Sequence, residues 1–386
     1  MFEPFPGNYV WNLSVNLAIC MGGSIGEMDS ANRSLLASAA EGEDLGTEAF
    51  FTAWCDMAAR LVELGEEDAS AGRCLSAAEK FRRACVYYMT AERTQSPHFT
   101  PRREAYSQML AAMQRAVDLG RLNCERVEVR YGSAGFPGLF VKGDGEGPRP
   151  CMVHCNGLDS VKEMIYWSGI GEALGRRGVS TVMIDHPGVG EAIRLRGLSG
   201  IPESERWAAA TVDFLETRPD VRADRIGMMG WSLGGYYAPR AAAFEPRFKL
   251  CVAWGANHNW GELQRLRLAR EGDRPVPHYW DHVQWVWGKH SLEEFMAFAP
   301  RISLVDVIDK ISVPFLITHG ANDRQIPIRY AHQSFDAAIN SPKRELKIFS
   351  EREGGVEHCS ADNMEPVRSY IADWIAETFA QMNRTG

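Results

Sequence analysis

Long apolar runs are missing from this sequence. No stretch of the 386 residues approaches the roughly 20 consecutive apolar residues that a membrane-spanning helix needs. The first residues, MFEPFP, also lack the basic region and the long apolar run of a secretory signal peptide. We therefore expect a cytoplasmic protein that does not bind a membrane.

Cysteine pairs and basic clusters are scarce as well. The 9 cysteines are an odd number and include no C-x-x-C pair, which disfavours both a disulfide framework and a zinc site. The 42 basic side chains are outnumbered by 50 acidic ones, so the net charge is −8. A negative surface repels phosphate, and no basic patch interleaved with aromatic residues is present. We expect no nucleic-acid partner.

The most informative stretch that is present is RIGMMGWSLGG, at residues 225–235. Its apolar start runs into GWSLG, which has the G-x-S-x-G pattern of a nucleophile elbow. Glycines near the serine allow the sharp strand-to-helix turn that exposes its hydroxyl and strains its backbone. The pattern predicts that Ser232 is a nucleophile, although an ordinary strand–loop–helix joint can have the same letters.

A nucleophilic serine needs a base, and the base needs an acid that orients it. In folds with this elbow the chain order is serine, acid, histidine. Asp323 follows a predicted apolar strand, and His358 follows a glycine-containing loop after the next strand. We therefore predict a catalytic triad of Ser232, Asp323 and His358. Asp323 could instead close a turn, and His358 could be a loop histidine bonded to backbone. The rival acids Asp306 and Asp309 precede the strand, at the wrong edge of the sheet.

The oxyanion hole is expected to combine two backbone N–H groups. Leu233, the residue after the nucleophile, should supply one of them. The other should come from the loop at residues 156–160, which follows a strand predicted over 150–155. Leu158 is the candidate donor in this loop and Gly157 is the alternative, although a plain turn would have a similar sequence.

The apolar pattern divides the chain into a helical region and an α/β region. Helical spacing predicts helices over 47–64, 71–92 and 101–119 in the first region. From residue 125 onward strands alternate with helices, one of them expected over 164–177, which favours a mostly parallel sheet covered on both faces. We assign 1–123 to a helical lid or dimerisation domain, 124–255 and 301–386 to the two parts of the α/β core, and 256–300 to a cap insertion.

The predicted cap insertion is rich in tryptophan, tyrosine and histidine. These side chains fit either a lid over a flat substrate or simple packing of the insertion on the core. His278 and His282 are four residues apart, as zinc ligands on a helix are, but no third ligand is evident and we expect no metal. His258 follows the strand after the elbow and is expected to face the cleft. Trp231 and Tyr236 are further candidate substrate-binding residues.

Several segments together resemble the α/β-hydrolases. They are NGLDSVKE at 156–163, DHPGVGEA at 185–192, GWSLGGYYAPRAAAFEPR at 230–247, AWG at 253–255, HGANDRQIP at 319–327 and EHC at 357–359. More narrowly, the chain resembles the group that contains 2,6-dihydroxypseudooxynicotine hydrolase, the fungal heptaketide hydrolases and the FrsA-like esterases. The resemblance implies an α/β-hydrolase fold with an extra helical N-terminal domain, and it maps the group's triad to Ser232, Asp323 and His358. Some members cleave a carbon–carbon bond next to a ketone with help from an acidic cap residue, for which Glu262 is the nearest candidate.

The sequence therefore predicts a serine hydrolase that cleaves a carbon–carbon bond next to a ketone in a small-molecule carbonyl substrate, without metal or organic cofactor. A carboxylesterase or an acyltransferase acting on an aromatic or polyketide-derived ester is the alternative with the same chemistry. A third possibility is a helical-repeat interaction protein with an inactive core, because residues 54–91 faintly resemble a tetratricopeptide helix pair. One pair is too few for an array, so the helical domain is expected to shape the cleft or a homodimer interface.

Overall fold

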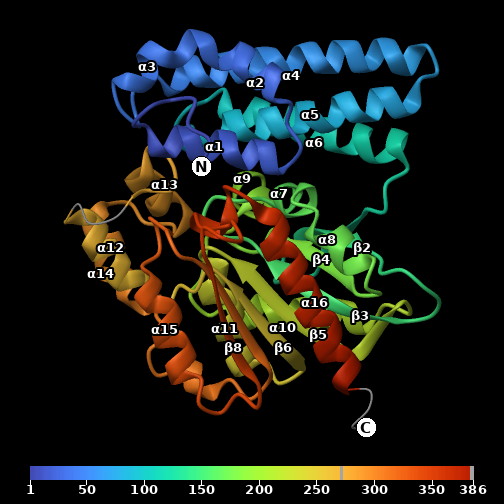
Figure 1. Cartoon of the computed structure of the whole chain (residues 1–386), viewed down its shortest axis with the longest axis vertical. Helices are drawn as coiled ribbons and strands as arrows, with labels where there is room; N and C mark the ends of the chain where they lie inside the picture. Colours follow the sequence, from blue (N-terminus) through green and yellow to red (C-terminus); the bar gives the residue numbers. More distant parts are fainter. Residues whose placement is uncertain (270–272, 383–386) are drawn as a thin grey trace. The chain divides into compact units, whose positions relative to one another are not determined.

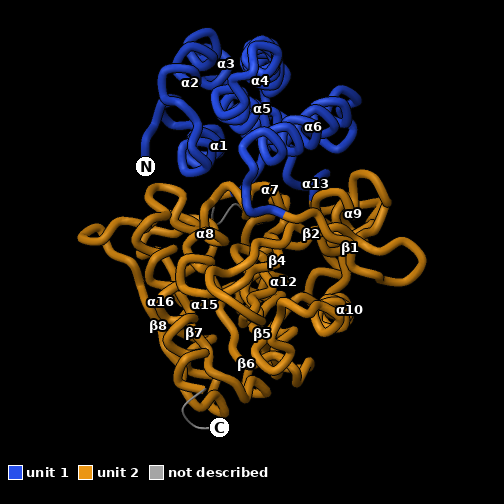
Figure 2. Tube along the Cα trace, turned by 90° about the vertical axis from the view of Figure 1, so that its right-hand side faces the viewer, with its two compact units in different colours: residues 1–124, 274–282 blue, residues 125–273, 283–386 orange. Residues whose placement is uncertain are grey.

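The computed structural model describes residues 1–269 and 273–382, and these residues form two compact units. The first unit comprises Met1–Cys124 and Arg274–His282, and the second comprises Glu125–Asp273 and Val283–Gly386 (Figure 2). Among the helices in the described ranges, none combines the length and the apolar character needed to cross a membrane.

The first unit is built from helices. Its elements are α1 (Tyr9–Cys20), α2 (Ile25–Asn32), η1 (Arg33–Leu35), α3 (Leu36–Ala40), α4 (Thr47–Ser70), α5 (Cys74–Arg93) and α6 (Arg102–Gly120). The three helices predicted from apolar spacing are confirmed as α4, α5 and α6. Buried aromatic rings join α1 to α4, since Phe50 stacks on Trp54 at 5.1 Å between centroids and meets Trp11 edge-on at 5.0 Å. Burial of these large side chains stabilises the helical unit.

The segment Arg274–His282 belongs to the helical unit, although in sequence it lies inside the predicted cap insertion. Polar contacts explain this grouping. The Arg274 guanidinium pairs with Glu43 at 3.1 Å, and the His278 backbone N–H donates to the Asp44 carboxylate at 2.8 Å. The insertion is thus divided between the two units rather than forming a body of its own.

The second unit contains an eight-stranded sheet with the order β1-β2-β4-β3-β5-β6-β7-β8. The strands are β1 (Glu125–Val129), β2 (Phe136–Val141), β3 (Arg149–Cys155), β4 (Ser180–Ile184), β5 (Val221–Trp231), β6 (Phe248–Trp254), β7 (Phe315–Gly320) and β8 (Arg344–Phe349). β2 runs antiparallel to both β1 and β4, and the remaining pairs from β4 to β8 are parallel. The predicted mostly parallel sheet is therefore confirmed.

Helices cover both faces of this sheet, with α16 on one face and α10 and α11 on the other (Figure 1). The helical elements are α7 (Lys162–Trp167), α8 (Ile170–Gly175), α9 (Gly190–Arg194), α10 (Ser204–Glu216), α11 (Gly234–Phe244), α12 (Trp260–Leu268), α13 (Tyr279–Val286, shared between the units), α14 (Leu292–Phe298), η2 (Ala299–Arg301), η3 (Ile308–Lys310), α15 (Ile328–Ala337), η4 (His358–Ser360) and α16 (Met364–Met382). The central strands are buried on both sides, which accounts for their continuous apolar sequences.

The single helix expected over residues 164–177 is wrong, because the structure contains two short helices, α7 and α8, in this region. The break occurs at Gly169, whose φ of +78° is left-handed and interrupts the helical path. A Cβ at this position would also lie 2.8 Å from the Arg368 guanidinium. The positive φ therefore favours glycine where the chain turns between the two helices.

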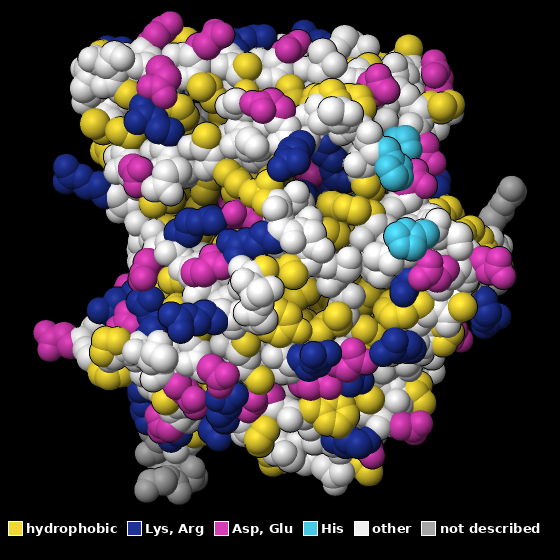
Figure 3. Space-filling view, turned by 180° about the vertical axis from the view of Figure 1, so that it is seen from behind, with side chains coloured by type: hydrophobic (Ala, Val, Ile, Leu, Met, Phe, Trp, Pro, Cys, Tyr) yellow, Lys and Arg dark blue, Asp and Glu magenta, His cyan; other side chains and the backbone are white. Residues whose placement is uncertain are grey.

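The surface carries both signs of charge in close mixture. On the face seen in Figure 3, lysine and arginine side chains are interspersed with aspartate and glutamate. Several arginines pair with nearby carboxylates, such as Arg218 with Glu125 at 2.8 Å and Arg247 with Asp213 at 2.6 Å. Exposed pairs of this kind contribute only about 0–1 kcal/mol each to the stability of the fold. Most of that stability therefore comes from the buried core.

The topology places the predicted catalytic residues at one edge of the sheet. Ser232 directly follows β5, Asp323 follows β7 by three residues, and His358 comes after the loop that leaves β8. Because β5 to β8 are neighbouring parallel strands, their carboxyl ends meet at the same edge. This is the edge at which open α/β sheets form their sites.

Candidate active site

Ser232 lies on a strained turn between β5 and α11. Its φ is +56°, in the left-handed region that costs a non-glycine residue roughly 1–3 kcal/mol. Backbone bonds on both sides maintain the turn: the Ser232 N–H donates to the Trp254 carbonyl at 3.0 Å, and the Gly235 N–H donates to the Ser232 carbonyl at 2.8 Å. The surrounding structure thus imposes the conformation that a nucleophile elbow requires.

The glycines of the motif are explained by close backbone approach. A Cβ on Gly230 would lie 2.7 Å from the carbonyl oxygen of Gly234, and one on Gly234 would lie 3.1 Å from that of Asn156. A Cβ on Gly235 would overlap the carbonyl oxygen of Gly255. A side chain at Gly230 or Gly235 would therefore collide with nearby backbone, and one at Gly234 would be tightly packed against it.

Gly235→Ala should lower the free energy of unfolding by about 3 kcal/mol, because the added methyl meets rigid backbone. Gly26→Ala is the matched control. Gly26 lies inside α2 with no atom within 4 Å of the new methyl, and we expect this change to be neutral or to stabilise by up to about 1 kcal/mol. Thermal melting of both variants measures the difference. Equal melting temperatures would contradict the crowding around residue 235.

The structure places His358 within hydrogen-bond distance of both Ser232 and Asp323. His358 Nε2 lies 2.9 Å from Ser232 Oγ, and His358 Nδ1 lies 2.9 Å from Asp323 Oδ2. The backbone N–H groups of Gln325 and Ile326 each donate to Asp323 Oδ1 at 2.9 Å. The carboxylate is therefore oriented toward the imidazole, and the imidazole toward the hydroxyl.

The charges of the acid and the histidine depend on each other. Burial raises the pKa of Asp323, but His358, His319 and the Ile326 N–H together lower it by more, to about 2. Burial likewise lowers the pKa of His358, but the Asp323 carboxylate and the neighbouring Cys359 together raise it by more, well above its ordinary value. The aspartate is consequently ionised at neutral pH, and the histidine has a stronger affinity for a proton than a free imidazole.

The predicted oxyanion loop lies directly against the nucleophile. A Cβ on Gly157 would be 2.9 Å from Ser232 Cβ, so only glycine allows this approach. The Gly157 N–H donates to Ser160 Oγ at 2.9 Å. The next residue, Leu158, is buried, and Leu233 is the N-cap of α11. The positive end of this helix dipole therefore points at the region of Ser232, where an oxyanion would form.

The four candidate substrate-binding residues lie in different surroundings. Trp231 is 3% exposed and its indole N–H donates to Ser160 at 3.0 Å. Tyr236 is fully buried and its hydroxyl donates to the Pro202 carbonyl at 2.9 Å.

Of the other two, His258 lies between β6 and α12, and Glu262 lies in the first turn of α12. His258 Nδ1 lies 3.1 Å from Ser334 Oγ, and Glu262 accepts a 2.6 Å hydrogen bond from the Tyr330 hydroxyl. Burial lowers the pKa of His258, which favours its neutral form.

Two neighbours of the triad were missed by sequence reasoning. His319 Nε2 lies 3.7 Å from Asp323 Oδ2 and 3.0 Å from the Ile326 carbonyl, and burial lowers its pKa, so it contacts the acid as a neutral ring. The Cys359 thiol lies 3.5 Å from His358 Nε2. Their adjacency to the acid and the base in HGAND and EHC was the available signal. The rival acids Asp306 and Asp309 precede β7, at its opposite end from Asp323.

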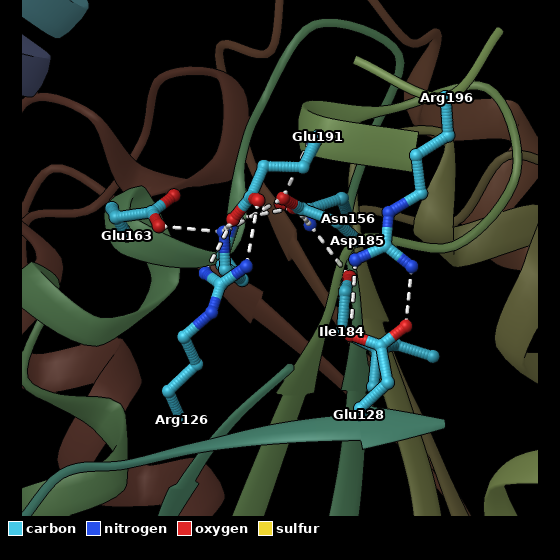
Figure 4. A network of polar contacts seen from close by, with 9 residues as sticks. Arg126, Glu128, Asn156, Glu163, Ile184, Asp185, Glu191 and Arg196 are labelled. Atoms are coloured by element: carbon cyan, nitrogen blue, oxygen red, sulfur yellow. Dashed lines mark hydrogen bonds and ion pairs between the residues drawn. The ribbon is translucent and has the colours of Figure 1, made fainter. Parts of the chain in front are cut away.

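A buried ionic network adjoins the predicted oxyanion loop (Figure 4). The Lys162 ammonium group, which has no exposed surface, contacts Glu163 at 2.6 Å, Asp185 at 3.0 Å and Glu191 at 2.5 Å. Arg126 adds a bidentate pair with Glu191, at 2.6 and 2.7 Å. Burial raises the pKa of Glu191, but Arg126 and Lys162 lower it by more, to about 2. Because each of these charges is paired with an opposite one, the ionised side chains can remain buried next to the loop.

Burial also raises the pKa of Glu163, to about 7, although Lys162 beside it acts in the opposite sense. One oxygen of the Glu163 carboxyl, Oε2, has no hydrogen-bond partner among the described residues. A missing partner disfavours the ionised carboxylate in a buried position, in agreement with the raised pKa.

A serine on a nucleophile elbow, with a histidine and an aspartate from the ends of neighbouring parallel strands, is typical of the α/β-hydrolases. The fold of the second unit is of this class. Residues 57–263 match the esterase FrsA-like family, and the chain belongs to this family. Residues 207–381 also match the prolyl oligopeptidase family. The chain is therefore a hydrolase, and the predicted fold class is confirmed.

Individual relatives support the same group. The 2,6-dihydropseudooxynicotine hydrolase of Paenarthrobacter nicotinovorans is 28% identical over 330 residues, which cover 84% of this chain and 83% of that protein. The 20-hydroxy-prefusarin hydrolase FUS2 of Gibberella moniliformis is 26% identical over 386 residues, which cover 89% and 91% of the two chains. The crystal structure of the 2,6-dihydroxy-pseudo-oxynicotine hydrolase matches with a TM-score of 0.77 and 25% identity, and covers 95% of each chain. The resemblance stated from the sequence is confirmed.

Proposed function

We propose that this protein is a serine hydrolase that cleaves a carbon–carbon bond next to a ketone through an acyl-enzyme on Ser232. The observation that carries the proposal is the position of His358, whose two ring nitrogens reach Ser232 Oγ and Asp323 Oδ2 at 2.9 Å each. This is the geometry of a base that can take the serine proton while an acid holds its ring.

In the first half-reaction, Ser232 Oγ attacks the ketone carbonyl and His358 accepts the hydroxyl proton. The N–H groups of Leu233 and Leu158 bind the oxyanion of the tetrahedral intermediate, at a contribution of roughly 3 kcal/mol per donor. Collapse of the intermediate breaks the carbon–carbon bond. The departing enolate or electron-rich aryl carbanion takes the proton from His358, and the acyl group stays on the serine.

In the second half-reaction, His358 removes a proton from water, and the resulting hydroxide attacks the acyl ester. The carboxylic acid is released and Ser232 regains its proton from His358. The net reaction adds one water across the broken bond, so one product is an acid and the other is the shortened carbonyl or arene. The carbon–carbon specificity is supported by the resemblance to a group in which some members cleave such bonds.

A carboxylesterase is the second candidate function, and membership of the FrsA-like esterase family favours it. The same residues would act on an ester, with an alkoxide in place of the carbanion. An acyltransferase differs only in the second step, where an alcohol or amine replaces water.

Mass spectrometry of the protein with two probes separates these functions. We expect 1-phenyl-1,3-butanedione to give a carboxylic acid and a shortened ketone, with a transient acyl mass on the peptide that contains Ser232. In H₂¹⁸O the acid should carry one ¹⁸O atom from the second step. Turnover of phenyl acetate but not of the diketone would point to the carboxylesterase. An acyl adduct on any other residue would overturn the proposal.

A further inference from the structure

Ser160 is a buried junction between the oxyanion loop and the nucleophile elbow. Ser160 is 5% exposed, and its hydroxyl accepts hydrogen bonds from the Gly157 N–H at 2.9 Å and the Trp231 indole at 3.0 Å and donates to Asn156 Oδ1 at 2.7 Å. A serine hydroxyl has one proton and two lone pairs. All of its bonding capacity is therefore used to join these three residues.

The loop side of this junction is anchored to the core of the sheet. Asn156 Nδ2 donates to the Ile184 carbonyl at 2.8 Å and to Asp185 Oδ1 at 3.2 Å (Figure 4). Asp185 in turn accepts from the Lys162 backbone N–H at 2.8 Å and pairs with its ammonium group. Both ends of the loop are thus bonded to the carboxyl end of β4. The side chains that make these bonds, Asn156, Lys162 and Asp185, have almost no exposed surface.

The elbow side of the junction is equally constrained. Trp231 directly precedes Ser232, and its ring packs edge-on against His154 and Trp254, with centroids 5.4 and 5.7 Å away. A buried indole held by two rings and one hydrogen bond leaves little freedom for the backbone beside it. The position of Trp231 therefore sets the position of the nucleophile and of the Leu233 N–H that follows.

We propose that Ser160 is a positioning residue, which with Trp231 holds the two N–H donors of the oxyanion hole at a fixed separation. The inference rests on the proposed function, because the separation matters only if Ser232 attacks a carbonyl. It also assigns the donors, since the Gly157 N–H is directed to Ser160 and the Leu158 N–H is the one that serves the oxyanion together with Leu233. Trp231 acts here through its indole N–H rather than as a substrate contact.

The test measures how fast a fluorophore-tagged fluorophosphonate labels Ser232. In this reaction the serine oxygen bonds to phosphorus, fluoride leaves, His358 takes the proton, and the phosphoryl oxygen occupies the oxyanion hole. We expect Ser160→Ala to slow labelling roughly 10- to 100-fold, as a misplaced catalytic group does. Trp231→Phe, which keeps the ring but removes the N–H, should slow it in the same sense and by less. The second variant supplies the test if the first does not fold.

Ser204→Ala is the matched control, because Ser204 is also fully buried and donates one tertiary hydrogen bond, to the Tyr237 carbonyl at 2.8 Å. The Ser204→Ala protein should be labelled at the wild-type rate, although it loses a similar amount of stability to Ser160→Ala. A purely structural role of Ser160 predicts equal rates in the two serine variants, and that result would overturn the inference.

Two further readouts separate positioning from damage to the triad. For hydrolysis of p-nitrophenyl acetate by Ser160→Ala, kcat should fall with KM within about twofold, and affinity for a trifluoromethyl ketone should fall by the same factor as kcat/KM. The pH at half-maximal kcat/KM should not move, because His358 and Asp323 are untouched. A moved pH midpoint would overturn the positioning role. Labelling of Ser232→Ala at the wild-type rate would instead defeat the proposed function itself.

Discussion

Ser232→Ala should lower kcat by roughly 10⁴- to 10⁶-fold and abolish fluorophosphonate labelling, because the variant retains the base, the acid and the oxyanion donors but has no atom to form the acyl-enzyme. Residual turnover would reflect water attacking a substrate bound in the same site. Steady-state hydrolysis of p-nitrophenyl acetate and of 1-phenyl-1,3-butanedione measures the loss. Ser204→Ala should keep both activities.

The same position offers an independent check on the elbow. Ser232 has a φ of +56°, which a glycine adopts without strain. Ser232→Gly should therefore be as inactive as Ser232→Ala but more stable than it by about 1 kcal/mol, as measured by denaturant unfolding. An alanine variant that is the more stable of the two would contradict the strained turn, and a fully active one would contradict the nucleophile.

Asp323→Asn should lower kcat roughly 10⁴-fold, since the amide would no longer stabilise the imidazolium or select the tautomer that accepts the serine proton. The pH dependence should change as well. In the wild type the base form of His358 appears only as pH rises through a pKa that the Asp323 carboxylate holds above the ordinary 6.5. The rising limb of kcat/KM should therefore be centred above pH 6.5.

Without the carboxylate, the largest influence that raises the His358 pKa is gone while burial still favours the neutral ring, so the midpoint of the residual activity should move to lower pH. Initial rates of p-nitrophenyl acetate hydrolysis between pH 5 and 9 measure the shift. Asp309→Asn is the control, because Asp309 lies in η3 at the opposite end of β7, and its profile should match the wild type. A midpoint that stays in place in Asp323→Asn would show that another group orients the base.

Much of the fold could be read from local pattern. The apolar periods of α4, α5 and α6 and the apolar runs of β3 to β7 each reflect one buried face or a fully buried strand, which a short window of sequence contains. The helix expected over residues 164–177 failed because a single glycine with positive φ, at Gly169, ends α7 and starts a new direction. The local spacing of the apolar residues does not distinguish this glycine from one that is tolerated inside a helix.

The sequence also did not predict that the segment Arg274–His282 groups with the helical unit. It depends on pairs such as Arg274 with Glu43, which are more than 200 residues apart along the chain. Charged residues of both signs are common on any surface, so the partner of a particular arginine is known only once the chain has folded.

The sequence by itself determined the candidate nucleophile, acid and base, because an elbow motif and the order of strand ends require only neighbouring residues and a count of strands. Only the tertiary structure decided which neighbouring groups position these three side chains. The hydrogen bonds of Ser160 to Gly157, Trp231 and Asn156 join two segments, the loop at 156–160 and the end of β5, and the Gly157 N–H is directed to the Ser160 hydroxyl. Which donor pairs with which acceptor depends on the orientation of single groups in a packed interior. The competing partners there come from strands that are distant in sequence and adjacent in the sheet.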